Sequence, residues 1–211
     1  MVNINKRWYI VKNLFFILFL VILNVGCSNS QEYKTLEKEA IIIAFGDSLT
    51  YGKGASSNET YPAVLGRLSG YNIINEGVNG DTAKNGVNRI KTVANKYNPD
   101  FVIVSLGGND MLRRDSLKLE SNLIKIIEYL KGKGILVAIL AEPKPSLIGI
   151  SDAEVYSEVS KKTNTLLIKN TFSKYFNNES LKSDRIHLNG KGYSLVAEDI
   201  YQVLLENGIF K

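Results

Sequence analysis

The chain has 211 residues, enough for one well-buried core and too few for two full-sized domains with a linker. Hydrophobic residues make up 45% of it, which is ordinary for a globular protein and excludes a disordered or collagen-like chain. The net charge is +5, but residues 1–26 carry three basic groups and no acidic one, so the remainder is nearly balanced and gives no argument for nucleic-acid binding.

The first 26 residues have the composition of an export signal. Lys6, Arg7 and Lys12 precede an apolar run over residues 14–25. That run is shorter than the roughly 20 residues of a membrane-spanning helix, and a basic flank before a short apolar stretch is typical of a secretory signal. We therefore expect residues 1–26 to be a signal peptide and the protein to be exported.

The single cysteine directly follows that segment, and one cysteine excludes an internal disulfide. The position of Cys27 after Gly26 resembles a bacterial lipobox, in which the cysteine is acylated and becomes the mature N-terminus. Asn24 stands where such motifs usually have Leu. We expect Cys27 to anchor the protein to a bacterial membrane, facing the periplasm or the cell exterior, with polar residues 27–39 as a tether. Ordinary signal cleavage and an uncleaved anchor are the alternatives.

From residue 40 onward, apolar runs alternate with helical patterns. Runs without polar alternation occupy residues 40–45, 101–104 and 135–140, and shorter ones occupy residues 73–74 and 166–168. Continuous apolar runs are typical of strands that are covered on both faces. The sequence therefore predicts a parallel sheet at the centre of the domain.

Between these runs, apolar residues recur at the spacing of amphipathic helices. The three sets are Val87, Ile90, Val93 and Tyr97; Leu119, Leu123, Ile126, Ile127 and Leu130; and Leu195, Val196, Ile200, Val203 and Leu204. Strands that alternate with helices through right-handed crossovers form a doubly wound sheet. We expect residues 40–211 to form one α/β domain with three α/β/α layers and a flavodoxin-like, doubly wound parallel sheet.

Four polar or glycine-rich segments lie where such a fold binds ligands. Residues 46–48, 75–82 and 107–110 follow the first three predicted strands, and residues 184–192 precede the last helix. Ligands bind beyond the carboxyl ends of the strands in these sheets. We expect the four segments to meet at one edge and to form the functional site.

Ser48 and His187 are the candidate catalytic pair. A serine hydroxyl is a useful nucleophile at neutral pH when an adjacent base takes its proton and a third group orients that base. His187 is the only histidine of the chain, and Asp184 lies three residues before it. In isolation each residue also fits a simpler role, such as a helix cap, a loop histidine or a turn aspartate.

Acyl transfer also requires donors for the negative charge that develops on the carbonyl oxygen. Gly80 offers a backbone N–H with no side chain in the way, Asn109 offers a side-chain amide, and the Ser48 N–H is a third candidate. Taken alone, Gly80 and Asn109 are also explained as turn residues.

Together these segments resemble the GDSL, or SGNH, hydrolase family, named for its Ser, Gly, Asn and His in four blocks. The matching stretches are Phe45-Gly46-Asp47-Ser48-Leu49-Thr50-Tyr51-Gly52, Gly80-Asp81-Thr82, Gly107-Gly108-Asn109-Asp110, and Asp184 with His187, Leu188, Asn189 and Gly192. The family usually has Pro where Leu188 stands.

The resemblance implies an SGNH hydrolase fold and a role for each matching residue. Ser48 is then the nucleophile, His187 the base and Asp184 the residue that orients it. The Ser48 N–H, the Gly80 N–H and Asn109 form the oxyanion hole. Asp47 and Asp110 fix the loops around them.

The thioesterase I, arylesterase and lysophospholipase group is the most similar part of the family. This implies short- to medium-chain acyl esters, thioesters or lysophospholipids as substrates, cleaved through an acyl-enzyme without a cofactor. Two alternatives stay open: a carbohydrate O-acetylesterase acting on cell-wall or surface glycans, and a catalytically silent lipoprotein that binds lipid or glycan.

Two further segments border the expected site. Arg113 and Arg114 offer charge to a phosphate or carboxylate, although a solvated loop is the simpler explanation. Residues 142–150 contain two prolines and are expected to form a loop beside the acyl groove. No His, Cys and carboxylate residues have the spacing of a metal site, so none is expected.

Overall fold

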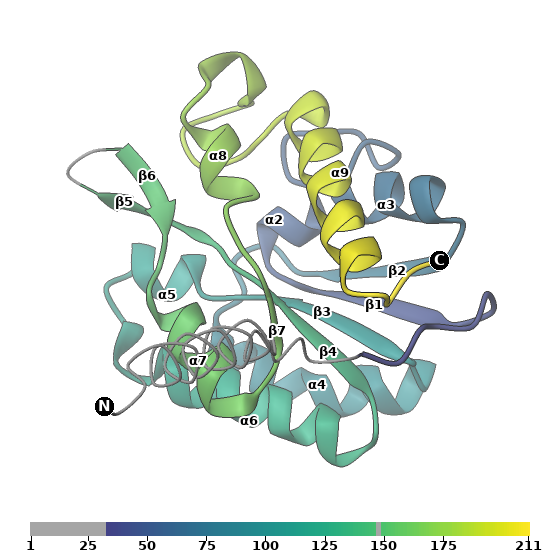
Figure 1. Cartoon of the computed structure of the whole chain (residues 1–211). Coiled ribbons are helices and arrows are strands. Elements are labelled where there is room, and N and C mark those ends of the chain that lie inside the picture. Colours follow the sequence, from purple (N-terminus) through teal and green to yellow (C-terminus); the bar gives the residue numbers. More distant parts are fainter. Residues whose placement is uncertain (1–32, 147–148) are drawn as a thin grey trace, which may run out of the picture. The chain divides into compact units, whose positions relative to one another are not determined.

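In the computed structural model, which describes residues 33–146 and 149–211, the central sheet has five parallel strands in the order β2-β1-β3-β4-β7 (Figure 1). The strands are β1 (Ile41–Gly46), β2 (Asn72–Gly77), β3 (Phe101–Ser105), β4 (Leu136–Leu140) and β7 (Leu166–Ile168). The chain moves from β1 to β2 on one side and then to β3 on the other. The predicted doubly wound parallel sheet is therefore confirmed.

The central strands β1, β3 and β4 are continuous apolar runs because side chains on both faces of the sheet are buried there, whereas the edge strand β2 has no buried residue. In β1, Ile42 and Ala44 belong to one hydrophobic core, whereas Ile43 and Phe45 belong to the other. All five residues of β3 are buried; Phe101 and Ile103 belong to the first core, and Val102 and Val104 belong to the second. Successive side chains of a strand point to opposite faces, so each strand supplies both cores.

Helices cover both faces of the sheet. They are α2 (Ser48–Tyr51), α3 (Tyr61–Ser69), α4 (Ala83–Tyr97), α5 (Gly108–Leu112), α6 (Leu119–Gly132), α7 (Val155–Thr163), α8 (Phe172–Phe176) and α9 (Gly190–Glu206), with 3-10 turns at Ser116–Lys118 and Glu179–Leu181. One core includes residues of α3, α8 and α9, and the other includes residues of α4, α6 and α7. Figure 1 shows the two groups on opposite sides of the sheet. The three predicted amphipathic helices are confirmed as α4, α6 and α9.

The compact unit begins at Tyr33, earlier than predicted. Leu36 is buried, its N–H donates to the Ile209 carbonyl at 2.9 Å, and its carbonyl accepts from the Tyr71 hydroxyl at 3.1 Å. The prediction of a tether up to residue 39 is therefore wrong for residues 33–39, because Leu36 holds that segment against the last residues of the chain. The predicted signal peptide and Cys27 lie outside the described residues.

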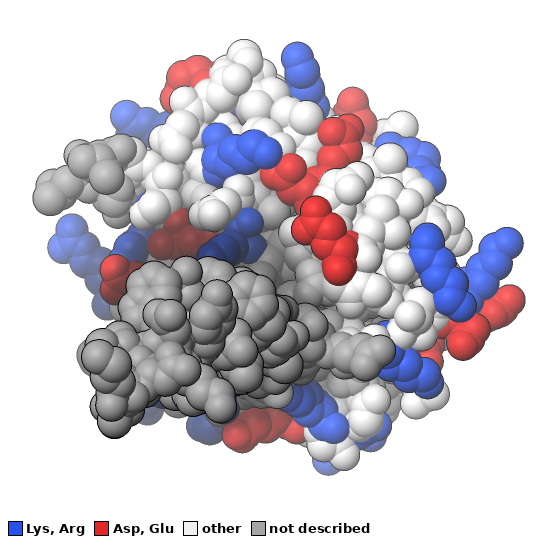
Figure 2. Space-filling model, viewed as in Figure 1, with Lys and Arg blue, Asp and Glu red and all other residues white. Residues whose placement is uncertain are grey.

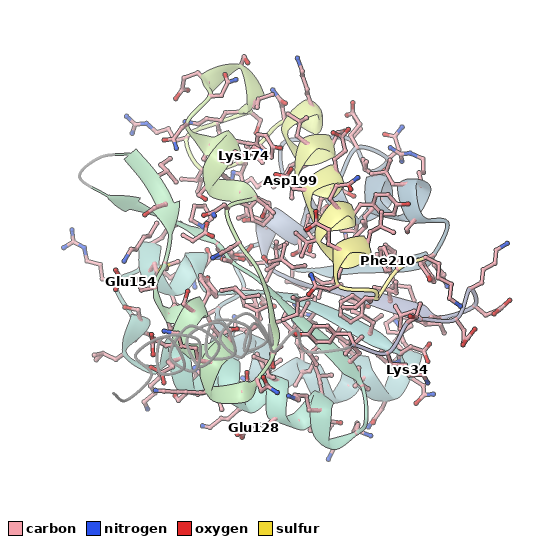
Figure 3. All side chains as sticks on the ribbon, viewed as in Figure 1. Lys34, Glu128, Glu154, Lys174, Asp199 and Phe210 are labelled. Carbon is pink, nitrogen blue, oxygen red and sulfur yellow. The ribbon has the colours of Figure 1, made fainter. Side chains whose placement is uncertain are left out.

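The segment after β4 is a two-stranded ribbon where a loop was expected. β5 (Pro143–Ser146) and β6 (Gly149–Asp152) pair in an antiparallel register. Prolines are tolerated there because both strands are edges, where a missing N–H interrupts no central ladder. The ribbon packs against α8, which Lys174 ties to Asp199 of α9 at 3.2 Å (Figure 3). Among the described residues, none of the helices has the length and apolarity needed to span a bilayer.

Candidate active site

Ser48 is the first residue of α2, and only Asp47 separates it from the end of β1. Two glycines allow this short helix to fold back onto the sheet. A Cβ at Gly46 would overlap the Thr50 side chain, and a Cβ at Gly77 would overlap the backbone of Tyr51. The close approach of α2 to β1 and β2 therefore requires glycine, and it places Ser48 at the carboxyl edge of the sheet.

Asp47 caps the helix that carries Ser48. Its Oδ1 accepts a hydrogen bond from the Leu49 N–H at 2.9 Å, and its side chain is buried. The helix ends after one turn at Gly52, whose φ of 85° is in the left-handed region that glycine adopts without strain. The Ser48 N–H, as the first of the helix, has no intrahelical acceptor and is free to meet a ligand.

His187 lies within hydrogen-bond distance of the serine. Its Nε2 is 3.1 Å from Ser48 Oγ, and its Nδ1 is 2.8 Å and 2.9 Å from the two carboxylate oxygens of Asp184. A neutral imidazole protonated at Nδ1 donates to Asp184 and leaves Nε2 as an acceptor for the serine hydroxyl. The structure thus brings together the three residues that the sequence singled out for nucleophilic catalysis.

A tight loop before α9 holds this acid and base together. The Ile186 N–H donates to Asp184 Oδ1 at 2.8 Å, and the Ser183 N–H donates to the His187 carbonyl at 3.0 Å. Partial burial alone would raise the pKa of Asp184, but the bonds from Ile186 and His187 outweigh it and hold that pKa below its usual value. Asp184 therefore stays ionised and keeps the His187 ring oriented.

The expected oxyanion donors face the same groove as Ser48. Gly80 lies in a turn closed by a 3.1 Å bond from the Asp81 N–H to the Val78 carbonyl, with a φ of 81°. Arg113 donates to the Gly80 carbonyl at 3.0 Å, which fixes the orientation of the turn. Gly80, Asn109 and Ser48 all line the groove.

Through its side-chain amide, Asn109 connects the sequence stretch that contains Ser48 with the stretch that contains Gly80. Its Nδ2 donates to Asp47 Oδ2 at 2.8 Å and to the Asp81 carbonyl at 2.9 Å. Both amide hydrogens therefore have acceptors in the protein, so an oxyanion must share one of them. Asp110, beside it, accepts from the Ala83 N–H at 2.9 Å and anchors the start of α4.

A groove of about 670 Å³ opens next to Ser48 and His187. Its apolar wall consists of Leu49, Met111, Leu112, Pro143, Ile150, Phe176 and Ile186. Several of these residues come from the ribbon and α8, so that part of the fold shapes the groove. Among the described residues, no group of His, Cys, Asp and Glu is arranged to hold a metal ion.

Comparison with known proteins decides the family. Residues 44–195 match the model of the GDSL-like lipase/acylhydrolase family. The chain belongs to this family. As a GDSL hydrolase it is a serine esterase, consistent with the geometry at Ser48.

Individual relatives of this GDSL hydrolase come from several bacteria. It is 26% identical over 208 residues to thioesterase 1/protease 1/lysophospholipase L1 of Escherichia coli strain K12, covering 94% of this chain and 93% of that protein. It is 29% identical over 127 residues to an arylesterase of Vibrio mimicus, covering 57% of this chain and 64% of that protein.

Solved structures show the same fold. TesA superposes with a TM-score of 0.73 at 22% identity, covering 79% of this chain and 99% of that one. AlinE4, an SGNH-hydrolase family esterase, superposes with a TM-score of 0.62 at 29% identity, covering 82% and 98%.

Glu142 is a part of the hydrolase site that the sequence did not reveal. It is fully buried after β4, accepts from the Ser105 hydroxyl at 2.9 Å, and accepts from the N–H of Gly108, the residue before Asn109. The available signal was a lone acid directly after the apolar run 135–141, at the edge where the other blocks meet.

Two buried carboxyl groups of the GDSL hydrolase, Asp47 and Glu142, thus lie next to the residues that are expected to form the oxyanion hole. Burial raises the pKa of Asp47 to about 7, and repulsion from Asp81 and Asp110 adds to the effect. Burial and the neighbouring Asp47 likewise raise the pKa of Glu142. The pair therefore retains a proton at a pH where exposed carboxyl groups have lost theirs.

Arg89 is a second residue that the sequence did not reveal. From α4 it donates to the Gly46 carbonyl at 2.8 Å and to Asp81 Oδ2 at 2.5 Å, with its guanidinium 3.9 Å from the Phe45 ring centroid. It thereby ties the end of β1 to the turn that carries Gly80.

Proposed function

We propose that the protein hydrolyses carboxylic esters and thioesters through an acyl-enzyme on Ser48. The observation that carries this proposal is the chain of hydrogen bonds from Ser48 through His187 to Asp184. In this assignment Ser48 is the nucleophile, His187 the general base and Asp184 the residue that holds the imidazole in the productive tautomer.

The reaction follows from these positions. Ser48 Oγ attacks the ester carbonyl as its proton passes to His187 Nε2. The resulting oxyanion accepts from the Ser48 and Gly80 N–H groups and from the Asn109 amide. When the carbon–oxygen or carbon–sulfur bond to the leaving group breaks, His187 gives its proton to that group. Water activated by His187 then attacks the acyl-enzyme and releases the acid and Ser48.

The groove favours acyl groups of short to medium length and the single chain of a lysophospholipid. Its apolar wall continues from Ser48 toward the ribbon and α8. Among the relatives, the E. coli protein is named a thioesterase and lysophospholipase, and the V. mimicus protein an arylesterase. These names and the groove together support a substrate with an apolar acyl chain.

A panel of 4-nitrophenyl esters tests the acyl preference. We expect protein lacking residues 1–30 to cleave acetyl, butyryl and octanoyl esters and to release fatty acid from a lysophospholipid, with kcat/KM highest at a short or medium chain. The Ser48→Ala variant, purified in parallel, controls for contaminating esterases. Activity confined to acetyl esters would contradict this substrate class and favour the alternative, an O-acetylesterase acting on glycans.

We further propose that the protein is exported and anchored in the bacterial cell envelope through a lipid on Cys27. The support is the basic flank, the short apolar run and the cysteine that follows it. We expect a fatty-acid probe to label the wild-type protein in cells and to leave Cys27→Ala unlabelled. Equal labelling of both would contradict the proposal.

A further inference from the structure

Four basic side chains line the groove beside Ser48. They are Lys53, Arg114, Lys144 and Arg185; Lys144 is in β5, and the other three come from three different loops. Within the part of the chain that the structure describes, none of the four forms a hydrogen bond or ion pair through its side chain. Arg113, in contrast, is used by the protein itself at the Gly80 carbonyl.

The groove offers almost no negative charge to balance these cations. Asp47 is the one carboxyl group that lines it among the described residues; it is buried, and its pKa is raised by that burial to about 7. Asp184, next to Arg185, is already engaged by His187 and Ile186.

The positive charge is local to the groove. Beyond residue 26, the sequence has 23 basic and 21 acidic residues. On the face shown in Figure 2, basic and acidic side chains are interspersed. The four cations of the groove, which is also lined by one buried carboxyl group, therefore create a positive potential at the site of reaction.

The four cations are not equivalent with respect to the scissile bond. Arg185 lies two residues before His187, and Lys53 follows the short helix that begins with Ser48. In the proposed mechanism His187 gives its proton to the alcohol part of the ester, so we expect these two cations to lie on the side of the leaving group. Arg114 instead follows α5, and Lys144 is in β5, next to residues of the apolar wall.

We propose that the substrate is an acyl ester whose alcohol part carries a phosphate or a similar anion, recognised chiefly by Lys53 and Arg185. Arg114 and Lys144 add to the positive potential along the groove. This inference rests on the proposed esterase function and narrows its substrate class. The anion belongs either to a soluble phosphorylated alcohol or to the headgroup of a lysophospholipid, since the two share the same chemistry.

Two esters that differ only in the phosphate test the proposal. They are 1-butyrylglycerol 3-phosphate and 1-butyrylglycerol, and the readout is the ratio of their kcat/KM values. We expect the ratio to be about ten in dilute buffer, since two exposed ion pairs with the phosphate each strengthen binding modestly. Raising the ionic strength from about 0.01 M to about 1 M should bring the ratio close to one.

Paired substitutions locate the anion. Lys53→Gln with Arg185→Gln should lower the ratio about fivefold. Arg114→Gln with Lys144→Gln should lower it less, and Lys125→Gln on the exposed side of α6 should leave it unchanged. If the Lys53 and Arg185 double variant keeps the wild-type ratio, the proposal is overturned. If the Arg114 and Lys144 double variant lowers the ratio more than the Lys53 and Arg185 variant does, the assignment of the anion to the alcohol part is overturned.

The outcomes separate this inference from the esterase function. If neither glycerol ester nor any 4-nitrophenyl ester is cleaved, the esterase function fails. If both glycerol esters are cleaved equally at low salt, the function stands and the inference is wrong. Measuring the same ratio with the lauroyl esters of glycerol 3-phosphate and glycerol distinguishes the two sources of the anion. A ratio that is higher for lauroyl than for butyryl esters points to a lysophospholipid, and an unchanged ratio points to a soluble phosphorylated alcohol.

Discussion

Replacing Ser48 or His187 by alanine is expected to lower kcat/KM for 4-nitrophenyl butyrate by about four to six orders of magnitude. Ser48→Ala removes the attacking oxygen. His187→Ala removes the base, and the chain has no second histidine to replace it. The measurement is steady-state hydrolysis followed by release of 4-nitrophenolate.

The effects of the two substitutions on kcat/KM should also be non-additive. Because the hydroxyl and the imidazole act as one unit, the double variant should be no slower than either single variant. Ser57→Ala, which removes an exposed hydroxyl on the loop before α3, is the matched control and should retain wild-type rates. Substantial activity in Ser48→Ala, or full loss in Ser57→Ala, would contradict the assignment.

Glu142→Ala is expected to destabilise the protein by about 2–5 kcal/mol, because it leaves the Ser105 hydroxyl and the Gly108 N–H buried without their acceptor. It should also lower kcat about tenfold to a hundredfold, since Gly108 precedes Asn109 and a misplaced donor stabilises the oxyanion poorly. Glu142→Gln keeps one oxygen for Gly108 and an amide for Ser105, so it should retain most of both properties.

Denaturant unfolding and kcat for one ester, measured on the same preparations, check this prediction. Glu128→Ala removes an exposed carboxylate on α6 and serves as the control (Figure 3). If Glu142→Ala unfolds at the same denaturant concentration as the wild type, the buried carboxyl group has no structural role.

The same carboxyl pair predicts how stability depends on pH. In the unfolded chain these groups titrate near pH 4, whereas in the folded protein the pKa of Asp47 is about 7 and that of Glu142 is also raised. Between these values the folded state binds more protons, so the free energy of unfolding falls as the pH rises. Glu142→Gln removes one of the two groups and should make this fall shallower. The titratable groups that face the pair are Asp81, Asp110, Tyr61, Tyr156 and Tyr193.

The fold was predictable where the sequence pattern is continuous. The uninterrupted apolar runs identified the central strands of the sheet, because both faces are covered there. α7 escaped prediction because it has only nine residues and two buried side chains, Tyr156 and Val159, which is too few for a clear helical period. The ribbon over 143–152 was expected to be a loop because prolines and polar residues rarely mark a strand.

The candidate site was predictable to the extent that it lies at strand ends. Ser48, Gly80 and Asn109 each follow a strand, and a parallel sheet brings such residues to one edge. Glu142 was missed although it follows a strand as well, because an acid beside prolines suggests a solvated loop. Its burial depends on Ser105 and Gly108, more than thirty residues away, and no local pattern encodes that packing.

Covalent labelling tests the central claim, that Ser48 is a nucleophile activated by His187. We predict that a fluorophosphonate probe adds once to the wild-type protein, that peptide mass spectrometry places the adduct on Ser48, and that His187→Ala reacts far more slowly. An adduct on another residue, or hydrolysis that persists in protein fully labelled at Ser48, would contradict the proposed mechanism.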